Sequence, residues 1–160
     1  MTITAQNSDD ARPDVTRRVA RGAGLHLDAH NFAWVPEFTL KTGRRIDLMG
    51  VSKRGLFWAV EVKSGIEDFR VDDKWHEYLV HCDQFSFAVS PTFPVDVLPP
   101  DVGIIITDGY EHYEKRQPTT TSLLNANARK SLLIQFARAA AYKMQGQANR
   151  LAALEGQSPP

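Results

Sequence analysis

The sequence predicts an α/β fold in which one mixed β-sheet is flanked by helices. Apolar residues recur with helical spacing near both ends of the chain, and strand-like runs and a third helical stretch lie between them. The length of 160 residues is typical of one domain, and 42% apolar residues can build a core without disulfides. We expect a single domain at residues 13–154, between disordered tails at 1–12 and 155–160.

The first helix is predicted to open at Pro13 and Asp14, because proline is tolerated in the first turn of a helix. It would run to about Leu27. Val15 and Val19 have the spacing of residues that face the core.

A three-stranded meander is expected after this helix. Alternating apolar residues predict strands at 32–40, 44–51 and 56–63. The intervening loops are Lys41-Thr42-Gly43 and Lys53-Arg54-Gly55. Both fit a three-residue hairpin loop whose third residue is left-handed, a conformation that glycine adopts most easily. Such loops fix the register, because the residues that flank each loop face each other.

The register brings charged residues together on one face of the meander. Glu37 opposes Asp47, and Asp47 in turn opposes Glu61. Side chains alternate along a strand, so Lys63 shares the face of Glu61. The opposite face would be apolar and would pack against the core through Phe38, Leu40, Ile46, Leu48, Leu56, Trp58, Val60 and Val62.

The second half of the chain is predicted to complete the sheet and to add two helical stretches. Ser64 and Glu67 have the spacing of a capping box, which predicts a helical stretch with a break near 71–72 and an end by Cys82. A last helix is expected at about 125–154. The remaining strands are expected at 85–90, 103–107 and 110–116. The strand at 103–107 is predicted to be buried on both faces, and the one at 110–116 is predicted to be a short edge strand.

Charge and cysteine content restrict the class of protein. The net charge is zero, with 19 basic and 19 acidic residues, which argues against strong nonspecific nucleic-acid binding from charge alone. Cys82 is the only cysteine, so no disulfide framework or cysteine-rich zinc site is available. No signal peptide or membrane span is evident, and we expect a cytoplasmic protein. The last helix is basic, and it either follows a phosphate backbone or presents a solvated face.

The charged face of the meander predicts a metal site. Three carboxylates on neighbouring strands repel one another, because opposed Cβ atoms lie about 4.5 to 5.5 Å apart. Lys63 neutralises one charge, and Mg²⁺ or Mn²⁺, which prefer carboxylate oxygens, would neutralise the rest. We predict Asp47, Glu61 and Lys63 as catalytic residues and Asp47, Glu61 and Glu37 as metal ligands. The alternative is an ordinary surface ion-pair ladder.

The same residues carry a family resemblance. Ile46-Asp47 and, thirteen residues later, Glu61-Val62-Lys63 match the pattern of the PD-(D/E)XK nuclease superfamily, with isoleucine in place of the proline. The chain over about 37–110 closely resembles the bacterial MmcB-like DNA repair proteins, in the runs GRRIDLMG, WAVEVKSGIEDFRVDDKWHEYLVHCDQFSFAVS and FPVDVLPPDVGIIITDGY. The resemblance implies a restriction-endonuclease-like fold, a role in DNA repair, and a nuclease-type triad of Asp47, Glu61 and Lys63.

Substrate contacts are expected on both sides of the triad. In similar nucleases basic or amide residues after the triad contact the scissile phosphate, so Lys74 and Gln84 are predicted to bind substrate, together with Arg45. Trp75 and Tyr78 have helical spacing and are predicted to pack in the core.

Four other candidates are set aside. His76-Glu77 is not a metalloprotease motif, because the next histidine, His81, comes one residue too late. His26 and His30 have the spacing of a paired metal site, but the predicted helix ends between them, so we do not expect zinc there. Ser64 lacks a histidine placed to activate it, and Asp83 disfavours a reactive Cys82 thiolate.

The leading hypothesis is a Mg²⁺-dependent or Mn²⁺-dependent hydrolase of DNA phosphodiester bonds that acts in repair. The superfamily resemblance implies that hydrolysis leaves a 5′-phosphate. The rival is a non-catalytic DNA-binding or adaptor module of a DNA damage response or mutagenesis pathway. A structural protein with only a surface ion-pair ladder is a third class. Expected partners are DNA, repair or error-prone polymerase proteins and a second copy of the chain, without a membrane.

Overall fold

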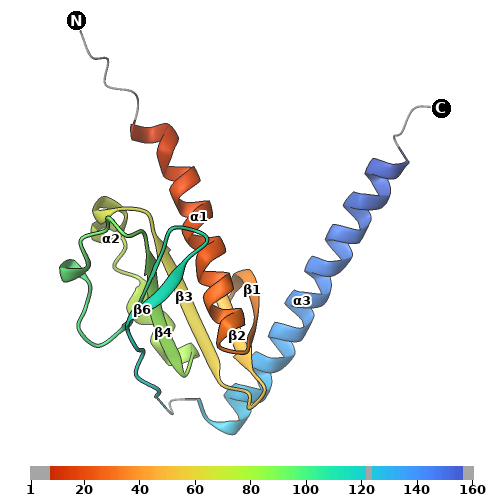
Figure 1. Cartoon of the computed structure of the whole chain (residues 1–160). Helices are drawn as coiled ribbons and strands as arrows, with labels where there is room; N and C mark the ends of the chain where they lie inside the picture. The colour runs from red at the N-terminus through yellow and green to blue at the C-terminus, as the bar shows by residue number, and fades with distance from the viewer. Residues whose placement is uncertain (1–7, 122–123, 157–160) are drawn as a thin grey trace, which may run out of the picture. The chain divides into compact units, whose positions relative to one another are not determined.

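The structure is a computed structural model that describes residues 8–121 and 124–156 (Figure 1). It divides into two compact units, residues 1–124 and Asn125–Pro160. The first unit holds the sheet and helix α1, and the second holds helix α3. The single domain expected at residues 13–154 therefore extends over two compact units.

The first unit is built on a six-stranded mixed sheet with the strand order β1-β2-β3-β4-β5-β6. The pairs β3/β4 and β4/β5 are parallel, and the other three pairs are antiparallel. The fold class predicted from the sequence is confirmed, and the arrangement is consistent with a restriction-endonuclease-like fold. The strands are Phe32–Thr39, Arg45–Ser52, Phe57–Lys63, Gln84–Val89, Gly103–Thr107 and His112–Arg116.

Two glycine loops fix the register of β1, β2 and β3, as predicted. Gly43 has φ 85° and its N–H donates to the carbonyl of Leu40 at 2.9 Å. Gly55 has φ 78° and its N–H donates to the carbonyl of Ser52, also at 2.9 Å. The strands then pair as expected from these loops, with Phe38 opposite Ile46 and Leu48 opposite Val60.

Helix α1, Ser8–Ala29, packs on one face of the sheet. It begins five residues earlier than predicted, with Pro13 inside it, so residues 8–12 are helical and not part of a tail. Five of the eight residues predicted for the apolar face of the meander pack in the core with this helix, and the other three, Phe38, Leu40 and Ile46, are also buried. The core here joins Val19, Ala23, Leu27, Phe32, Leu48, Trp58, Val60, Val62, Ala88 and Ile105.

The other face of the sheet is covered by α2, Ile66–Val71, and the 3₁₀ helix η1, Trp75–His81. The predicted break falls at 72–74, between these two elements. Trp75 is buried and stacks on Phe85 with ring centroids 6.0 Å apart, which confirms its packing role. The predicted capping box does not form.

Ser64 does not cap the helix as predicted, because it donates hydrogen bonds to Asp68 instead. Gly65 is the N-cap of α2, and no side chain caps the helix. The backbone N–H and the hydroxyl of Ser64 both donate to Asp68, at 3.1 and 3.4 Å. Asp68 therefore ties the end of β3 to the first turn of α2.

The remaining elements agree with the sequence analysis. β5 is buried along its whole length, and β6 is the edge strand. The short 3₁₀ helix η2, Val95–Val97, lies in the proline-containing loop between β4 and β5. In the second unit, α3 runs from Ala126 to Glu155, and the side chain of Asn125 caps it by accepting the N–H of Ala128 at 2.9 Å. None of the helices in the described ranges has the length and hydropathy needed to cross a membrane.

Substituting Gly22 by alanine tests how closely α1 lies on the sheet. A Cβ at Gly22 would come 1.8 Å from the hydroxyl oxygen of Thr107 on β5. Thr107 cannot turn away freely, because its hydroxyl donates to the carbonyl of Glu111 and accepts the N–H of Gly109. We expect Gly22→Ala to lower the free energy of unfolding by about 1–3 kcal/mol in a urea titration.

The matched control is Gly146→Ala in α3, where an added Cβ meets no atom within 4 Å. Alanine is the better helix former by roughly 1 kcal/mol, so this variant should be as stable as the parent or more so. A Gly22→Ala protein that matches the parent in stability would mean that α1 is not seated so close to β5.

Candidate functional site

The predicted triad lies on the sheet face opposite α1, at the end of β3. Asp47 comes from β2, and Glu61 and Lys63 come from β3. They alternate with Leu48, Val60 and Val62, which point to the α1 core. The three charged side chains therefore share one face because the neighbouring positions are needed for the core.

Asp47 and Glu61 meet where the ladder between β2 and β3 ends. Strand pairing reaches only to Leu48 and Val60 at this end. Beyond it, the Oδ2 of Asp47 accepts the backbone N–H of Val62 at 2.8 Å, and the Oε2 of Glu61 accepts the N–H of Asp47 at 3.4 Å. The two carboxyl groups thus take the place of backbone carbonyls, and each is held by the neighbouring strand.

Burial shifts the titration of both carboxyl groups. Desolvation raises the pKa of Glu61 to about 8, helped by the negative charge of Asp47 and opposed by Lys63. Desolvation also raises the pKa of Asp47, although the hydrogen bond from Val62 and the charge of Lys63 oppose this. Glu61 is only 7% exposed. The pair therefore lacks a counter-charge strong enough to keep both groups ionised at neutral pH.

Lys63 is held by an acid that the sequence analysis did not select. Its ammonium lies 4.0 Å from Oε1 of Glu61 but forms a closer ion pair and hydrogen bond with Asp72. Desolvation alone would raise the pKa of Asp72, but the hydrogen bonds from Lys63 and from the backbone N–H of Lys74 leave it below its usual value. The only signal in the sequence was the position of Asp72 at the break in the helical pattern.

A cavity of about 960 Å³ opens over these side chains. Arg12 and Thr16 of α1 and Tyr78 of η1 contribute to its wall. Burial and the negative charges of Glu61, Asp72 and Asp47 raise the pKa of Tyr78 to about 12, so its hydroxyl keeps its proton. The acidic lining residues outnumber the basic ones, with Asp47, Glu61, Glu67, Asp68 and Asp72 against Arg12, Lys63 and Lys74.

Two of the predicted substrate-binding residues lie near the triad. Lys74 is exposed and lines the cavity. Arg45 is exposed at the start of β2, where its charge opposes the rise in the pKa of Asp47, although it is not among the described residues that line the cavity. The hydroxyl of Tyr78 donates to the backbone carbonyl of Arg45 at 3.2 Å.

The structure does not bring Glu37 into this cavity. Glu37 lies between two residues that pair in the predicted register, Pro36 with Leu48 and Phe38 with Ile46. Its own backbone is left-handed, with φ 50°, and its side chain is exposed. An alternating strand pattern does not foresee such a residue, because a left-handed residue departs from the extended backbone on which the alternation rests.

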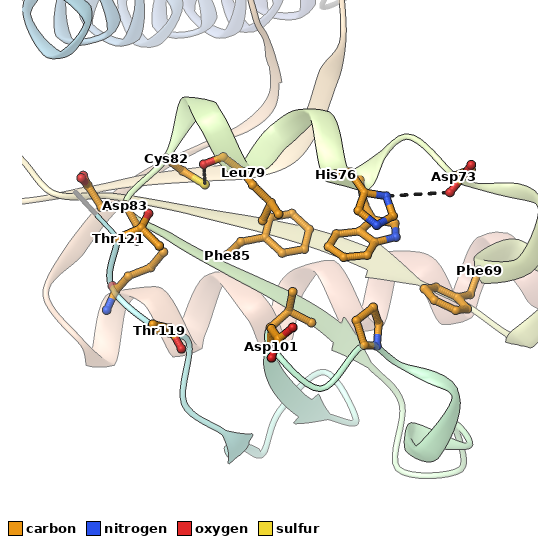
Figure 2. A pocket seen from close by; sticks show the side chains of 14 residues that line it. Phe69, Asp73, His76, Leu79, Cys82, Asp83, Phe85, Asp101, Thr119 and Thr121 are labelled. Carbon is orange, nitrogen blue, oxygen red and sulfur yellow. Dashed lines mark hydrogen bonds and ion pairs between the residues drawn. The ribbon is translucent and has the colours of Figure 1, made fainter. Parts of the chain in front are cut away.

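Gln84 lies at the other end of the sheet. It opens β4 opposite Trp58, whereas Lys63 pairs with Val89 at the far end of that strand. Its amide donates to the hydroxyl of Thr120 at 2.9 Å. Gln84 lines a different cavity, of about 820 Å³, whose apolar wall includes Phe69, Leu79 and Phe85 (Figure 2).

The residues of the motifs rejected in the sequence analysis are engaged in contacts with their neighbours. His76 is exposed and pairs with Asp73 at 3.8 Å (Figure 2). Glu77 accepts two hydrogen bonds from Arg44, at 2.7 and 3.1 Å. Burial raises the pKa of Cys82 to about 12, and nearby Asp83 contributes, so this thiol is not poised as a nucleophile.

Comparisons with known proteins agree with this structure. A family model described as DNA repair protein MmcB-like matches residues 4–151. A solved structure of a protein of unknown function from Silicibacter pomeroyi is similar, with a TM-score of 0.80 and 38% sequence identity over 90% of this chain and 95% of that chain. No curated protein matches the chain. Since the family match spans nearly the whole chain, the protein belongs to the MmcB-like DNA repair protein family.

Proposed function

We propose that this protein is a metal-dependent DNA phosphodiesterase that acts in repair. The observation that carries the proposal is the pair of carboxyl groups of half-buried Asp47 and buried Glu61, beside the buried ammonium of Lys63 in one open cavity. Membership of a DNA repair family supports DNA as the substrate. Buried ionisable groups with perturbed pKa values in a cleft are typical of functional sites.

The donor set suits Mg²⁺ or Mn²⁺. Mg²⁺ is usually bound by one or two carboxylates together with water and substrate phosphate, and Asp47 and Glu61 offer two such carboxylates. Both groups have raised pKa values, which a divalent ion beside them would reverse. Bound there, the ion would polarise a phosphoryl oxygen and make an attacking water more acidic.

The remaining residues of the site would hold the phosphate and its charge. The ammonium of Lys63 is 3% exposed and is oriented by Asp72, so it is preorganised beside the carboxylates. It can stabilise the negative charge that develops on a phosphoryl oxygen, or hold the attacking water. Lys74 and Arg12, which are exposed at the wall, can contact the DNA backbone.

The rival function, a non-catalytic DNA-binding or adaptor module, is favoured by one observation. Lys63 is already paired with Asp72, and an ammonium held in this way has less of its charge available for a phosphate. The two functions differ in one measurable property, which is the cleavage of DNA in the presence of the metal.

Cleavage of single-stranded, nicked, flapped and four-way DNA with Mg²⁺ or Mn²⁺ tests the site directly. We expect Asp47→Asn and Lys63→Met to lower the cleavage rate by about 100-fold or more, because the first removes the charge of a metal ligand and the second removes the ammonium that would face the phosphate. The matched control is Glu37→Gln, the same kind of change at an exposed residue, which should leave the rate unchanged.

The outcomes separate the hypotheses. Parent-level cleavage in both Asp47→Asn and Lys63→Met would refute the assignment of the site. Binding without cleavage of any substrate would favour the adaptor module, and the DNA affinity should then fall steeply with salt.

A second prediction concerns pH and the stability of the metal-free protein. The pKa of Glu61 is raised from 4.5 to about 8, so the folded chain keeps a proton that the unfolded chain releases between these values. The associated stability is present at low pH and is lost as the pH rises through 8. We expect Glu61→Gln, which stays neutral, to melt at a higher temperature than the parent at pH 8 and to differ little from it at pH 5.

Adding Mg²⁺ completes this experiment. At pH 8 the ion should raise the melting temperature of the parent, because it binds the ionised carboxylates of the folded state. It should have much less effect on Glu61→Gln. A Glu61→Gln protein that is less stable than the parent at pH 8 would show that burial does not raise the pKa of Glu61.

A further inference from the structure

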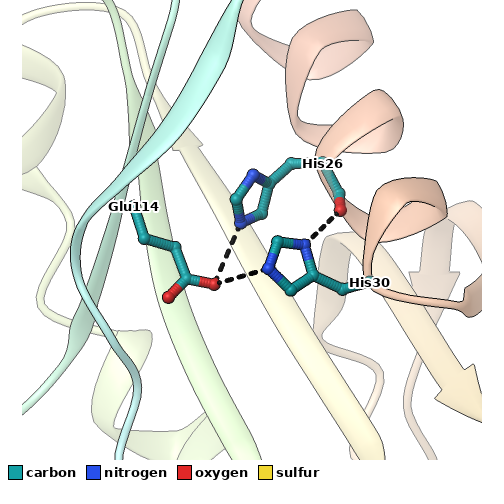
Figure 3. A group of neighbouring side chains, drawn as sticks. All are labelled: His26, His30 and Glu114. Carbon is teal, nitrogen blue, oxygen red and sulfur yellow. Dashed lines mark hydrogen bonds and ion pairs between the residues drawn. The ribbon is translucent and has the colours of Figure 1, made fainter.

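A second cluster of polar side chains lies on the α1 side of the sheet, away from the proposed nuclease site. His26 and His30, at the end of α1, meet Glu114 of the edge strand β6 (Figure 3). One ligand atom from each residue lies within 4.8 Å of the other two. Both imidazole rings lie 5.7 Å from the ring of Trp58, which is about 16 Å along β3 from Lys63.

The two histidines share a face because α1 is longer than the sequence predicted. The predicted helix ended at about Leu27, which separated the pair, but α1 continues to Ala29. The N–H of His30 then bonds to the carbonyls of His26 and Leu27, at 3.2 and 3.1 Å, so the last turn extends through it. The spacing of four residues therefore places both rings on one side of the helix end.

The hydrogen bonds of His30 leave a lone pair facing a carboxylate. Its Nδ1 lies 2.8 Å from the carbonyl oxygen of His26, and a carbonyl only accepts, so Nδ1 carries the hydrogen. In neutral His30 the unprotonated nitrogen is then Nε2, which lies 3.2 Å from Oε1 of Glu114. Two acceptors at this distance repel each other unless a positive species lies between them.

A second imidazole nitrogen, from His26, faces the same carboxylate oxygen of Glu114. Its Nε2 lies 3.1 Å from Oε1 of Glu114, and its Nδ1 lies 3.0 Å from Nδ1 of His112. One of the two Nδ1 atoms must donate to the other. When His26 donates to His112, its Nε2 lone pair also points at Glu114. The ring is 2% exposed, and burial lowers its pKa, so the neutral form is favoured.

Two of the three ligand-atom distances suit a tetrahedral ion, and the two imidazole nitrogens lie within 4.8 Å of each other. Zinc bonds to imidazole nitrogen and carboxylate oxygen at about 2.0 to 2.2 Å, which places tetrahedral ligand atoms about 3.3 to 3.5 Å apart. The nitrogen to oxygen distances of 3.1 and 3.2 Å are within a few tenths of an ångström of that spacing. The side chain of His30 is 43% exposed, which leaves a path for entry and room for a water as fourth ligand.

The outer contacts are compatible with those of metal-bound histidines. Such histidines usually donate their other ring N–H to a carbonyl or another acceptor, which fixes the tautomer that binds the metal. His30 has this contact with the carbonyl of His26, and His26 has it in the tautomer in which its Nδ1 donates to Nδ1 of His112. Two imidazole nitrogens favour zinc over Mg²⁺, which prefers oxygen ligands.

We propose that His26, His30 and Glu114 bind a zinc ion that fastens the end of α1 to the edge strand β6. β6 has only one neighbouring strand in the sheet, so a metal link to α1 would hold its free side. This site is independent of the proposed nuclease function, and it would exist in a protein that cuts no DNA.

Zinc titration of the metal-free full-length protein tests the proposal. Calorimetry should show one zinc per chain at this site, and Co²⁺ in its place should give the visible absorption of a tetrahedral ion. We expect His30→Ala and Glu114→Gln each to weaken zinc binding by at least tenfold, because each removes one of three protein ligands. Zinc should raise the melting temperature of the parent by several degrees and that of His30→Ala much less.

Two controls distinguish this site from other histidines and from the carboxylate pair. His81→Ala removes a histidine outside the cluster, and Asp47→Asn alters the proposed nuclease site, and neither should change the affinity for zinc. His30 is partly exposed, so His30→Ala should fold, and circular dichroism checks this. The absence of saturable zinc binding, or binding that both His30→Ala and Glu114→Gln retain, would overturn the proposal.

Discussion

The register between β2 and β3 is the constraint on which the rest of the structure depends. Two left-handed glycines, Gly43 and Gly55, set the lengths of the hairpins and so decide which residues oppose one another. A slip of one residue would turn Trp58 and Val60 away from α1 and would send Glu61 into an apolar core. The same geometric choice therefore builds the core on one face and gathers charge on the other.

The sequence predicted those parts of the structure that follow from local rules. Alternating apolar residues and three-residue glycine loops act over short distances, so the strands, the register and the meeting of Asp47 with Glu61 could be derived. The partner of Lys63 could not, because the place of Asp72 depends on how the chain turns between α2 and η1. Glu37 was misplaced for a similar reason, since its left-handed backbone breaks the alternation.

The end of α1 shows how a small error in a boundary changes a functional conclusion. Helix ends are hard to place from sequence, since the last turn depends on tertiary contacts. An end at about Leu27 separated His26 from His30, whereas the observed end at Ala29 unites them. Glu114 adds a contact between distant parts of the sequence, and no local pattern could have supplied it.

The bare backbone at Gly22 has a consequence for how this fold tolerates change. Because the helix touches Thr107 with no side chain in between, there is no clearance for α1 to roll about its axis or to slide along the sheet. The N-terminal part of α1 carries Arg12 and Thr16, and its C-terminal end carries His26. The close contacts of Gly22 with Thr107 and of Gly24 with Trp34 thus set the orientation of both ends of α1, and sequence change elsewhere along the helix is tolerated only while these contacts are kept.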